Sequence, residues 1–533
     1  MKHLIILLTL AATTLTSWAQ QKVAVFSIND FHGAFVRNDD KGIVGAPSLW
    51  QTLDSLKRVY PYNVTVSAGD NFGGSYFYNA THGVLLPVLF NDLGIRLSAL
   101  GNHEFDDGQA SLADKWSHSP LRPKGWDITY VSSNVREVST GAVPNFAQPA
   151  AITTLTLPGG KPFTIAFVGL IASSTPQQAS IRKLRGLTFD GNYPAVLDSV
   201  LALPVGEEVK RANLRLILSH NGTITNAQGQ PQWEDKDAAN LARINSRLWQ
   251  GFISSHSHKR VCGYINDSHM PVVQGKWHGD YISMLLCTVD TATMQVTRVE
   301  PHSIPVTPKA HLEAGPARLQ AQIDSLLTHT RTAGGTPIGT PLTIAEHDMP
   351  HDRDQKYRQS EVGTLVCRAY AEAFRKNQHL KDGTPIVGCS HFGSIRAGFT
   401  KGKITVLDVG ETLPFSNALK AYRISGAQLL SLVQFGNHNK AYGWLQTGNL
   451  EVKKDAEGNV TTLTYVSPKG KRTQIKDTTL CYLVADEFIT NGGDGYSPSF
   501  FPKDQEVKTE GMPATTDAFI DYLKTFKVLS IKY

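Results

Sequence analysis

Short runs rich in β-branched residues recur through residues 22–290, and stretches with helical periodicity lie between them. A short apolar run is typical of a buried strand, and repeated alternation of strand and helix indicates an α/β fold. A second α/β unit follows from about residue 338 to the C-terminus. The runs in the first part are Val23–Ile28, Val64–Val66, Ile128–Val131, Thr164–Leu170, Leu214–Leu218, Phe252–Ile253, Pro271–Val273 and Ile282–Val289.

The chain has 533 residues, which at roughly 100–200 residues per domain is enough for two to four domains. Residues 315–329 have the apolar spacing of one amphipathic helix, and the sequence Ala-Gly-Gly that follows suits a hinge. We therefore predict a catalytic domain over residues 20–310, a linker helix over residues 311–335 and a second domain over residues 336–533.

The first nineteen residues have the layout of a secretory signal peptide. A basic start precedes the apolar run Leu4–Ala12, and small residues end the segment at Ala19, where we expect cleavage. The apolar run is too short to span a bilayer, and no later stretch approaches ~20 apolar residues. We expect a periplasmic or secreted protein without a membrane span.

Charge and cysteine content narrow the class only slightly. The net charge is +6, and no block of five or more basic residues occurs, so a nucleic-acid polymer is not an expected partner. The five cysteines lack CxxC spacing and allow at most two disulfides. Cys262 and Cys287 both fall in strand-like segments and are candidates for one, with the pairing left open.

Metal-binding residue types follow five strand-like runs of the first domain. Asp, Asn and His supply the oxygen and imidazole ligands of divalent metals, and in α/β sheets ligands bind beyond the carboxyl ends of the strands. Each residue alone is more often a cap or a turn residue, but seven together suffice for two metals. They are Asp30, His32, Asp70, Asn102, His220, His256 and His258.

Two metals that share a carboxylate support one chemistry in particular. Held ~3.5–4 Å apart, they can clamp both oxygens of a phosphoryl displacement and generate a hydroxide near neutral pH. Asp70 could bridge them because a carboxylate has two oxygens. Imidazole and carboxylate ligands without thiolates fit Zn, Mn, Fe or Co better than Ca or Mg, and the choice among the four stays open.

In their order along the chain, these blocks resemble the calcineurin-like metallophosphoesterases, specifically the exported bacterial 5′-nucleotidase/UDP-sugar hydrolase/2′,3′-cyclic phosphodiesterase family. The resemblance covers essentially the whole mature chain. It implies an N-terminal metallophosphoesterase domain, a four-layer α/β sandwich, and a C-terminal α/β 5′-nucleotidase substrate-binding domain.

The same resemblance assigns roles to the metal-site residues. His103 and Asp106 match the catalytic pair, in which His103 would stabilise developing charge or protonate the leaving oxygen while Asp106 orients its ring. Ser255 stands where the family usually has Gly, and we expect altered backbone freedom with metal binding retained. One metal would be held by Asp30, His32, Asp70 and His258, the other by Asp70, Asn102, His220 and His256.

The C-terminal half carries residues suited to a nucleotide. Aromatic rings stack on bases, Arg binds phosphate through two hydrogen bonds, and Asp accepts from sugar hydroxyls. By resemblance, the base would lie between Phe415 and Phe488, the ribose at Asp494 and the phosphate at Arg358 and Arg396.

Three positions in this half depart from the family pattern. His391 replaces an Asn, Phe392 replaces a Gly, and Thr364 stands where Asn is common. The bulk of Phe392 could narrow or reshape the pocket, which leaves the nucleotide preference less defined than the metal chemistry.

We predict an exported enzyme with two divalent metal ions that hydrolyses nucleoside 5′-monophosphates by direct attack of metal-bound hydroxide, without a covalent intermediate. Three hydrolase activities stay open: 2′,3′-cyclic-nucleotide phosphodiesterase/3′-nucleotidase, UDP-sugar hydrolase and a thiosulfohydrolase. From another class, a non-catalytic nucleotide-binding envelope protein is the alternative, which the complete ligand set disfavours. The oligomeric state also stays open.

Overall fold

The computed structural model describes residues 20–39, 42–114, 126–179, 182–234, 236–265, 269–352, 355–381 and 383–529, and the predicted signal peptide lies outside them. The chain divides into two compact units, Met1–Asp324 and Ser325–Tyr533. The helix expected over residues 315–329 is present as α10 (Ala314–His329), and the division falls within it.

The first unit contains two six-stranded sheets whose inner faces pack together. The first sheet has the order β16 (Gln295–Pro305), β15 (Tyr281–Asp290), β1 (Gln20–Ile28), β2 (Asn63–Ser67), β3 (Leu97–Ala99) and β4 (Thr129–Val131). The second has the order β13 (Arg260–Ile265), β14 (Met270–Gly275), β12 (Gly251–Ile253), β9 (Leu214–His220), β7 (Lys161–Ile171) and β6 (Ala150–Leu157).

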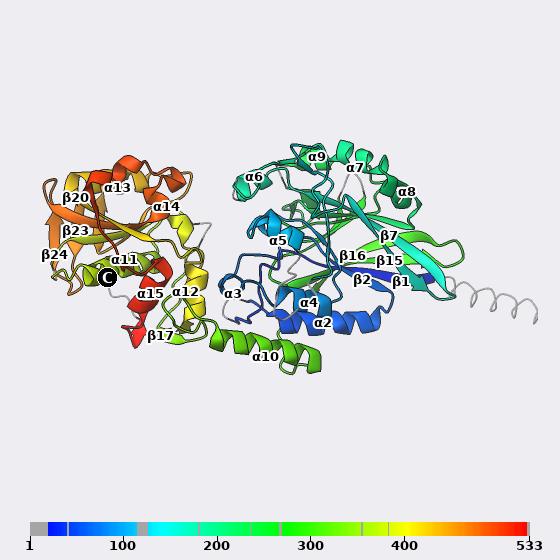
Figure 1. Ribbon diagram of the computed structural model, residues 1–533, viewed down its shortest axis with the longest axis horizontal. Helices are drawn as coiled ribbons and strands as arrows, with labels where there is room; N and C mark the ends of the chain where they lie inside the picture. The colour runs from blue at the N-terminus through cyan, green and yellow to red at the C-terminus, as the bar shows by residue number, and fades with distance from the viewer. Residues whose placement is uncertain are drawn as a thin grey trace, which may run out of the picture. The chain divides into compact units, whose positions relative to one another are not determined.

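Alternating apolar side chains hold these layers together. Val23 and Val25 of β1 face a core that Leu216 and Leu218 of β9 complete, since successive strand residues point to opposite faces. Outside the sheets, α2 (Ala46–Val59) and α4 (Leu86–Asp92) lie on one side, and α7 (Tyr193–Leu201) and α8 (Pro204–Arg211) lie on the other (Figure 1). The predicted four-layer α/β sandwich is confirmed.

Strand direction decides where the loops of the first unit meet. Strands β1 to β4 run parallel to one another, and β7, β9, β12 and β14 do the same in the second sheet. The carboxyl ends of parallel strands share one edge, so the loops after β1, β2 and β3 are neighbours, as are those after β9 and β12. These five loops carry the predicted metal ligands.

The second unit is built on a five-stranded sheet. Val387 and Cys389 of β18 pack towards α13 (Gly426–Asn437), whereas Gly388 meets α11 (Glu361–Asn377), so helices cover both faces. Strands β18 and β25 are parallel, and their loops leave the same edge. The strand order is β21 (Gln446–Gly448), β18 (Ile386–Ser390), β25 (Leu480–Asp486), β20 (Leu419–Ser425) and β26 (Glu506–Val507).

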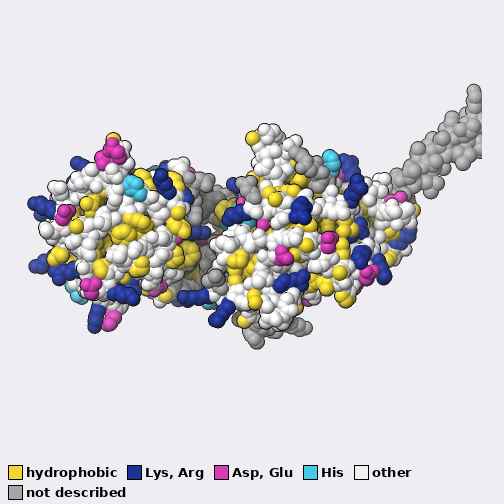
Figure 2. Space-filling model, turned by 90° about the horizontal axis from the view of Figure 1, so that it is seen from above, with side chains coloured by type: hydrophobic (Ala, Val, Ile, Leu, Met, Phe, Trp, Pro, Cys, Tyr) yellow, Lys and Arg dark blue, Asp and Glu magenta, His cyan; other side chains and the backbone are white. Residues whose placement is uncertain are grey.

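All five cysteines lie among the described residues and are free thiols, so the candidate disulfide between Cys262 and Cys287 is absent. No helix within the described ranges has the length and apolar content to cross a bilayer. On the face shown in Figure 2, basic side chains are scattered among acidic ones rather than gathered in a stripe.

Candidate active site

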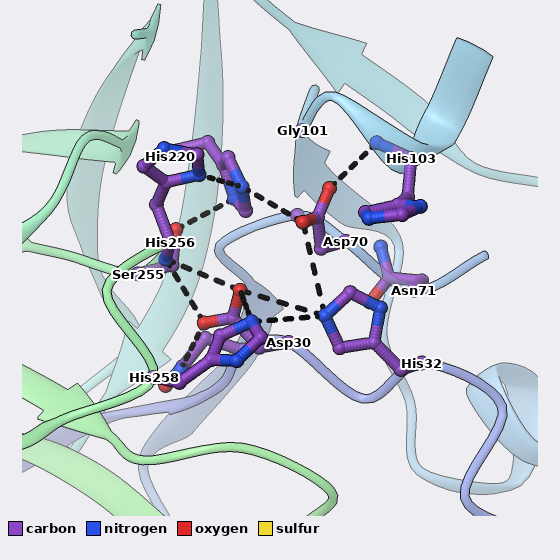
Figure 3. A network of polar contacts seen from close by, with 12 residues as sticks. Asp30, His32, Asp70, Asn71, Gly101, His103, His220, Ser255, His256 and His258 are labelled. Carbon is purple, nitrogen blue, oxygen red and sulfur yellow. Dashed lines mark hydrogen bonds and ion pairs between the residues drawn. The ribbon is translucent and has the colours of Figure 1, made fainter. Parts of the chain in front are cut away.

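The loops at the carboxyl ends of β1, β2, β3, β9 and β12 bring seven of the predicted site residues into one network (Figure 3). Their ligand atoms form groups in which every atom lies within 4.8 Å of the others. The groups are Asp30, His32 and His258; Asp70, His220 and His256; and His32, Asp70 and His103.

Asp70 joins these groups. Its Oδ2 lies 3.1 Å from Nε2 of His220 and 3.8 Å from Nε2 of His32. These two histidines come from different ligand groups. Imidazole nitrogens also approach each other within two of the groups, at 3.1 Å between His32 and His258 and 3.2 Å between His220 and His256. Nitrogens and oxygens that converge in this way suit a shared cation.

The backbone is strained at most of the predicted ligands. Asp30, His32, Asp70, His256 and His258 have φ values of 47°, 50°, 52°, 75° and 57°. Residues other than glycine seldom adopt this left-handed backbone conformation, and each such residue reduces the stability of the fold by on the order of 1–3 kcal/mol. The turns that aim these side chains inward are therefore maintained although the backbone of these residues prefers another conformation, which is typical of functional sites.

The residues present fit a divalent cation. Oδ1 of Asn102 is buried, and within the described part of the chain it has no hydrogen-bond partner. An unpartnered buried acceptor costs free energy, which a cation would remove. The remaining donors are carboxylates and imidazoles, the set that transition metals prefer over Ca or Mg.

Glu104 connects the loop after β2 to the loop after β3. Its fully buried carboxylate accepts hydrogen bonds from the backbone N–H groups of Asp70 (2.8 Å), Asn71 (2.8 Å) and Gly101 (2.7 Å), and from the Asn71 side chain (2.9 Å). A Cβ on Gly101 would lie 2.1 Å from Oδ1 of Asp70, so only glycine allows this approach. Burial and the Asp70 charge raise the pKa of Glu104 to about 7.

Ser255 supports His220 rather than loosening the backbone. Its hydroxyl lies 2.7 Å from Nδ1 of His220, and its single O–H is within donating distance of the carbonyl oxygens of Ala68 (2.8 Å) and Ser219 (3.0 Å). Ser255 is not among the residues with positive φ, so glycine is not required at this position. The departure from the family pattern therefore adds a contact to the ring of a predicted ligand.

His103 and Asp106 form a pair at the rim of the network. Nδ1 of the His103 ring lies 2.7 Å from the Asp106 carboxylate. The backbone N–H of His103 donates to Oδ1 of Asp70. Burial lowers the pKa of His103, but the charge of Asp70 and the hydrogen bond to Asp106 outweigh it and raise the pKa to about 9. The His103 side chain is 34% exposed, so it combines a retained proton with access to solvent.

The second unit contains a cavity of about 500 Å³ at the edge where β18 and β25 end. It brings together four of the five predicted nucleotide-binding residues, Arg396, Phe415, Phe488 and Asp494. Phe415 and Phe488 are 57% and 42% exposed, and Cζ of Arg396 lies 5.8 Å from the centroid of the Phe415 ring. Arg358 is half-buried and is not among the described residues that line this cavity.

Two family models match this chain. Residues 24–260 match the calcineurin-like phosphoesterases, and residues 338–500 match the 5′-nucleotidase C-terminal domain. The 5′-nucleotidase-related protein of Glossina morsitans morsitans is 22% identical over 550 residues, covering 96% of this chain and 93% of that protein. The 5′-nucleotidase of Bos taurus is 22% identical over 516 residues, covering 92% and 85%.

Two solved structures share the fold. The 5′-nucleotidase precursor of Thermus thermophilus has a TM-score of 0.63 at 22% identity and covers 96% of this chain and 97% of its own. The sulfate thiohydrolase SoxB of Thermus thermophilus has a TM-score of 0.61 at 15% identity and covers 96% of each.

The chain belongs to the calcineurin-like phosphoesterases that carry a 5′-nucleotidase C-terminal domain. It is therefore a metal-dependent phosphoesterase.

Several residues that line or support the two sites of the phosphoesterase were not predicted from its sequence. Glu104 stands in the block Gly-Asn-His-Glu, whose acidic end is a visible signal. Asn417 stands two residues after Phe415 and lines the cavity. Lys356 and Tyr442 also line it, but nothing in the sequence marks either residue.

Phe392, whose bulk was expected to narrow or reshape the pocket of the phosphoesterase, lies mostly inside the second unit. Its ring is 4% exposed and stacks on His351 at a centroid distance of 4.1 Å. The residue lines the cavity, but most of its bulk packs inside the unit.

Replacing Glu104 by Gln should weaken metal binding, because an amide cannot accept all four hydrogen bonds that position the loops after β2 and β3. Replacing a residue that positions metal ligands typically lowers metal affinity roughly 10–100-fold, and we expect a decrease in that range in a metal titration. Glu313→Gln removes an exposed carboxylate of the same unit and should leave the affinity unchanged. Wild-type affinity in Glu104→Gln would contradict the positioning role.

Replacing Asp106 by Asn should move the alkaline limb of the kcat/KM profile to lower pH. Asp106 helps to raise the pKa of His103, so its loss lowers that pKa and deprotonates His103 at lower pH. The neighbouring Asp107→Asn change removes the same charge without breaking this hydrogen bond and should shift the limb less. Equal shifts in both variants would refute a specific role for Asp106.

Proposed function

We propose that this phosphoesterase is an exported 5′-nucleotidase that uses two divalent cations to hydrolyse nucleoside 5′-monophosphates to nucleoside and phosphate. The supporting observation is the convergence of two ligand groups, Asp30 with His32 and His258 and Asp70 with His220 and His256, with Oδ2 of Asp70 3.8 Å from Nε2 of His32. The second unit adds a cavity with exposed aromatic rings and a guanidinium, the groups that recognise a base and a phosphate.

In this proposal, Zn, Mn, Co or Fe occupies both positions. Bound there, the cations would polarise the phosphoryl oxygens and lower the pKa of water. Asn29 donates to the Asp30 carboxylate at 2.7 Å and Ser255 lies against His220, so the chain orients its donors before any cation binds. Asp30, His32, Asp70 and His258 would hold one cation, and Asp70, Asn102, His220 and His256 the other.

His103 would act on the leaving group. Because Asp106 engages Nδ1, Nε2 is the nitrogen left to donate a proton to the ester oxygen. The hydrogen bond and the charge of Asp106 favour the protonated ring, whose positive charge would also stabilise the charge that develops on the phosphoryl oxygens.

Nucleotide recognition is assigned to the second unit. We place the base at Phe415 and Phe488, the sugar at Asp494 and the phosphate at Arg396 and Arg358. Stacking on an exposed ring is worth roughly 1–3 kcal/mol and tolerates different bases, so we expect little preference among AMP, GMP and UMP.

Export is proposed on the pattern of residues 1–19, which lie outside the described residues. Amino-terminal sequencing of the protein recovered outside the cytoplasm should begin at Gln20. A mature protein that retains Met1 would contradict this part of the proposal.

Phosphate release should be fastest from AMP and UMP when the protein is assayed against cyclic AMP, UDP-glucose and p-nitrophenyl phosphate as well. Removal of metal by a chelator should abolish release from every substrate, and adding back Zn, Mn, Co or Fe should restore it. Faster hydrolysis of cyclic AMP or UDP-glucose would contradict the proposed substrate and favour the one that is hydrolysed faster.

Replacing Phe415 by Ala should raise KM for AMP roughly 5- to 100-fold, which corresponds to the loss of one stacked ring. KM for p-nitrophenyl phosphate should change little, since this substrate has no base. Equal increases for both substrates would argue against stacking at Phe415.

A further inference from the structure

Gln274 is a fully buried amide near the end of β14. Ile253 of β12 pairs with Val273 of β14, so Gln274 lies level with Ser254, the first residue after β12. In the strand order β12 lies between β14 and β9, and predicted ligands stand at the carboxyl ends of both β12 and β9. The register therefore places an amide, with two N–H donors and a carbonyl acceptor, beside the loops that follow these two strands.

The amide nitrogen of Gln274 holds the loop after β12. Nε2 lies 2.6 Å from the hydroxyl of Ser257 and 2.6 Å from the carbonyl oxygen of Lys259. Because a carbonyl oxygen only accepts hydrogen bonds, the group that faces Lys259 is the amide nitrogen, which fixes the orientation of the side chain. Ser257 and Lys259 flank His258 in the turn that presents His256 and His258 to the network of Figure 3.

The amide oxygen of Gln274 faces the loop after β9. Oε1 lies 2.9 Å from the hydroxyl of Ser254 and 3.3 Å from that of Thr223. The Ser254 hydroxyl also lies 2.7 Å from the carbonyl oxygen of Asn221. The Ser257 hydroxyl, which accepts from Nε2, donates to the carbonyl oxygen of Thr223. One side chain therefore connects the loop after β12 to the loop after β9.

The turn that Gln274 holds has a strained backbone. His256 and His258 have φ values of 75° and 57°, and Ser257 stands between them. Such conformations persist only where the surrounding structure holds them in place. Gln274 reaches the turn from a separate strand, so the support that it gives does not depend on the turn itself.

We propose that Gln274 is a positioning residue for the candidate cation sites. Its amide holds the turn of His256 and His258 against the loop after β9, so that both imidazoles converge on the cations. Gln274 acts through Ser257 and Lys259 and is not itself a ligand. This inference rests on the proposed function, which assigns His256 and His258 to the two cations. It follows that Gln274 sets the affinity for the cations and leaves the reaction unchanged once they are bound.

Gln274→Met keeps the length of the side chain and removes all of its hydrogen bonds. When the protein is freed of metal by a chelator and titrated with Mn²⁺ in a calorimeter, the affinity of this variant should fall roughly 10–100-fold, as for other residues that position metal ligands. With saturating Mn²⁺, kcat for p-nitrophenyl phosphate should stay within about threefold of the wild-type value, because Gln274 contacts no reacting atom. Wild-type affinity in the folded variant would overturn the inference.

Ser257→Ala tests the same contact from the other side and decides the question if Gln274→Met does not fold. Its Mn²⁺ affinity should fall roughly 3- to 10-fold, as expected for the loss of one hydrogen bond. In the double variant, the combined loss should be smaller than the product of the two single losses, because both changes remove one shared contact. Unchanged affinity in Ser257→Ala, or single losses that simply multiply, would refute the inference.

Asn213→Leu is the matched control. The Asn213 amide also joins separate segments, since it accepts from the backbone N–H of Thr164 and donates to the carbonyl oxygen of Met294. It precedes β9, at the opposite end of that strand from His220. This change should lower the melting temperature of the metal-free protein and leave the Mn²⁺ affinity unchanged. An equal loss of affinity in Asn213→Leu would refute a specific role for Gln274.

The titration of the wild-type protein separates this inference from the proposed function. A wild-type protein that binds two Mn²⁺ ions but releases no phosphate from AMP would refute the proposed substrate alone, because the titration involves no nucleotide. A wild-type protein that binds no Mn²⁺ would refute the assignment of the cation ligands, and this inference with it.

Discussion

The Asp70 carboxylate is the group on which the rest of the first site depends. Its Oδ2 lies near histidines from two ligand groups, and its Oδ1 accepts the backbone N–H of His103. It therefore joins both candidate cation positions and also positions the loop that carries the predicted catalytic residue. Glu104 holds Asp70 in turn, so two buried carboxylates lie within one small volume. Buried charge of one sign is costly unless it is paired, which explains why histidines and a cation-binding geometry surround it.

The two sheets stabilise a site that is locally unfavourable. Five predicted ligands have left-handed backbone, and each carries strain on the order of 1–3 kcal/mol. Such turns persist when the strands before them cannot move, and β1, β2, β9 and β12 are anchored by a core that both sheets share. The same rule operates in the second unit, where β18 and β25 end beside His391 and α14 (Glu487–Thr490). In both units, parallel strands bring distant loops to one edge, and only the residue types differ.

Much of the fold and of the metal site could be predicted from sequence, because both leave local signals. Apolar runs marked the strands, and the residues after them marked most of the side chains that the structure brings together. The supporting contacts left weaker signals. Glu104 was visible only as part of a block, and Tyr442 reaches its cavity from a loop without any pattern. The expectation for Ser255 concerned backbone freedom, whereas the structure shows a hydroxyl beside His220. Contacts of this kind join residues far apart in the chain, so no local pattern reports them.

The sequence by itself determined the α/β class, the order of the strands along the chain and the presence of seven metal-ligand residue types at strand ends. These follow from periodicity and side-chain chemistry, which are local properties. Only the tertiary structure decided that Asp70 lies between two ligand groups, that Nδ1 of His103 lies 2.7 Å from the Asp106 carboxylate, and that Nδ1 of His391 lies 2.6 Å from Oδ2 of Asp494. Hydrogen bonds and pKa values depend on distances of a few ångströms between distant segments, and those distances exist only once the sheets have packed.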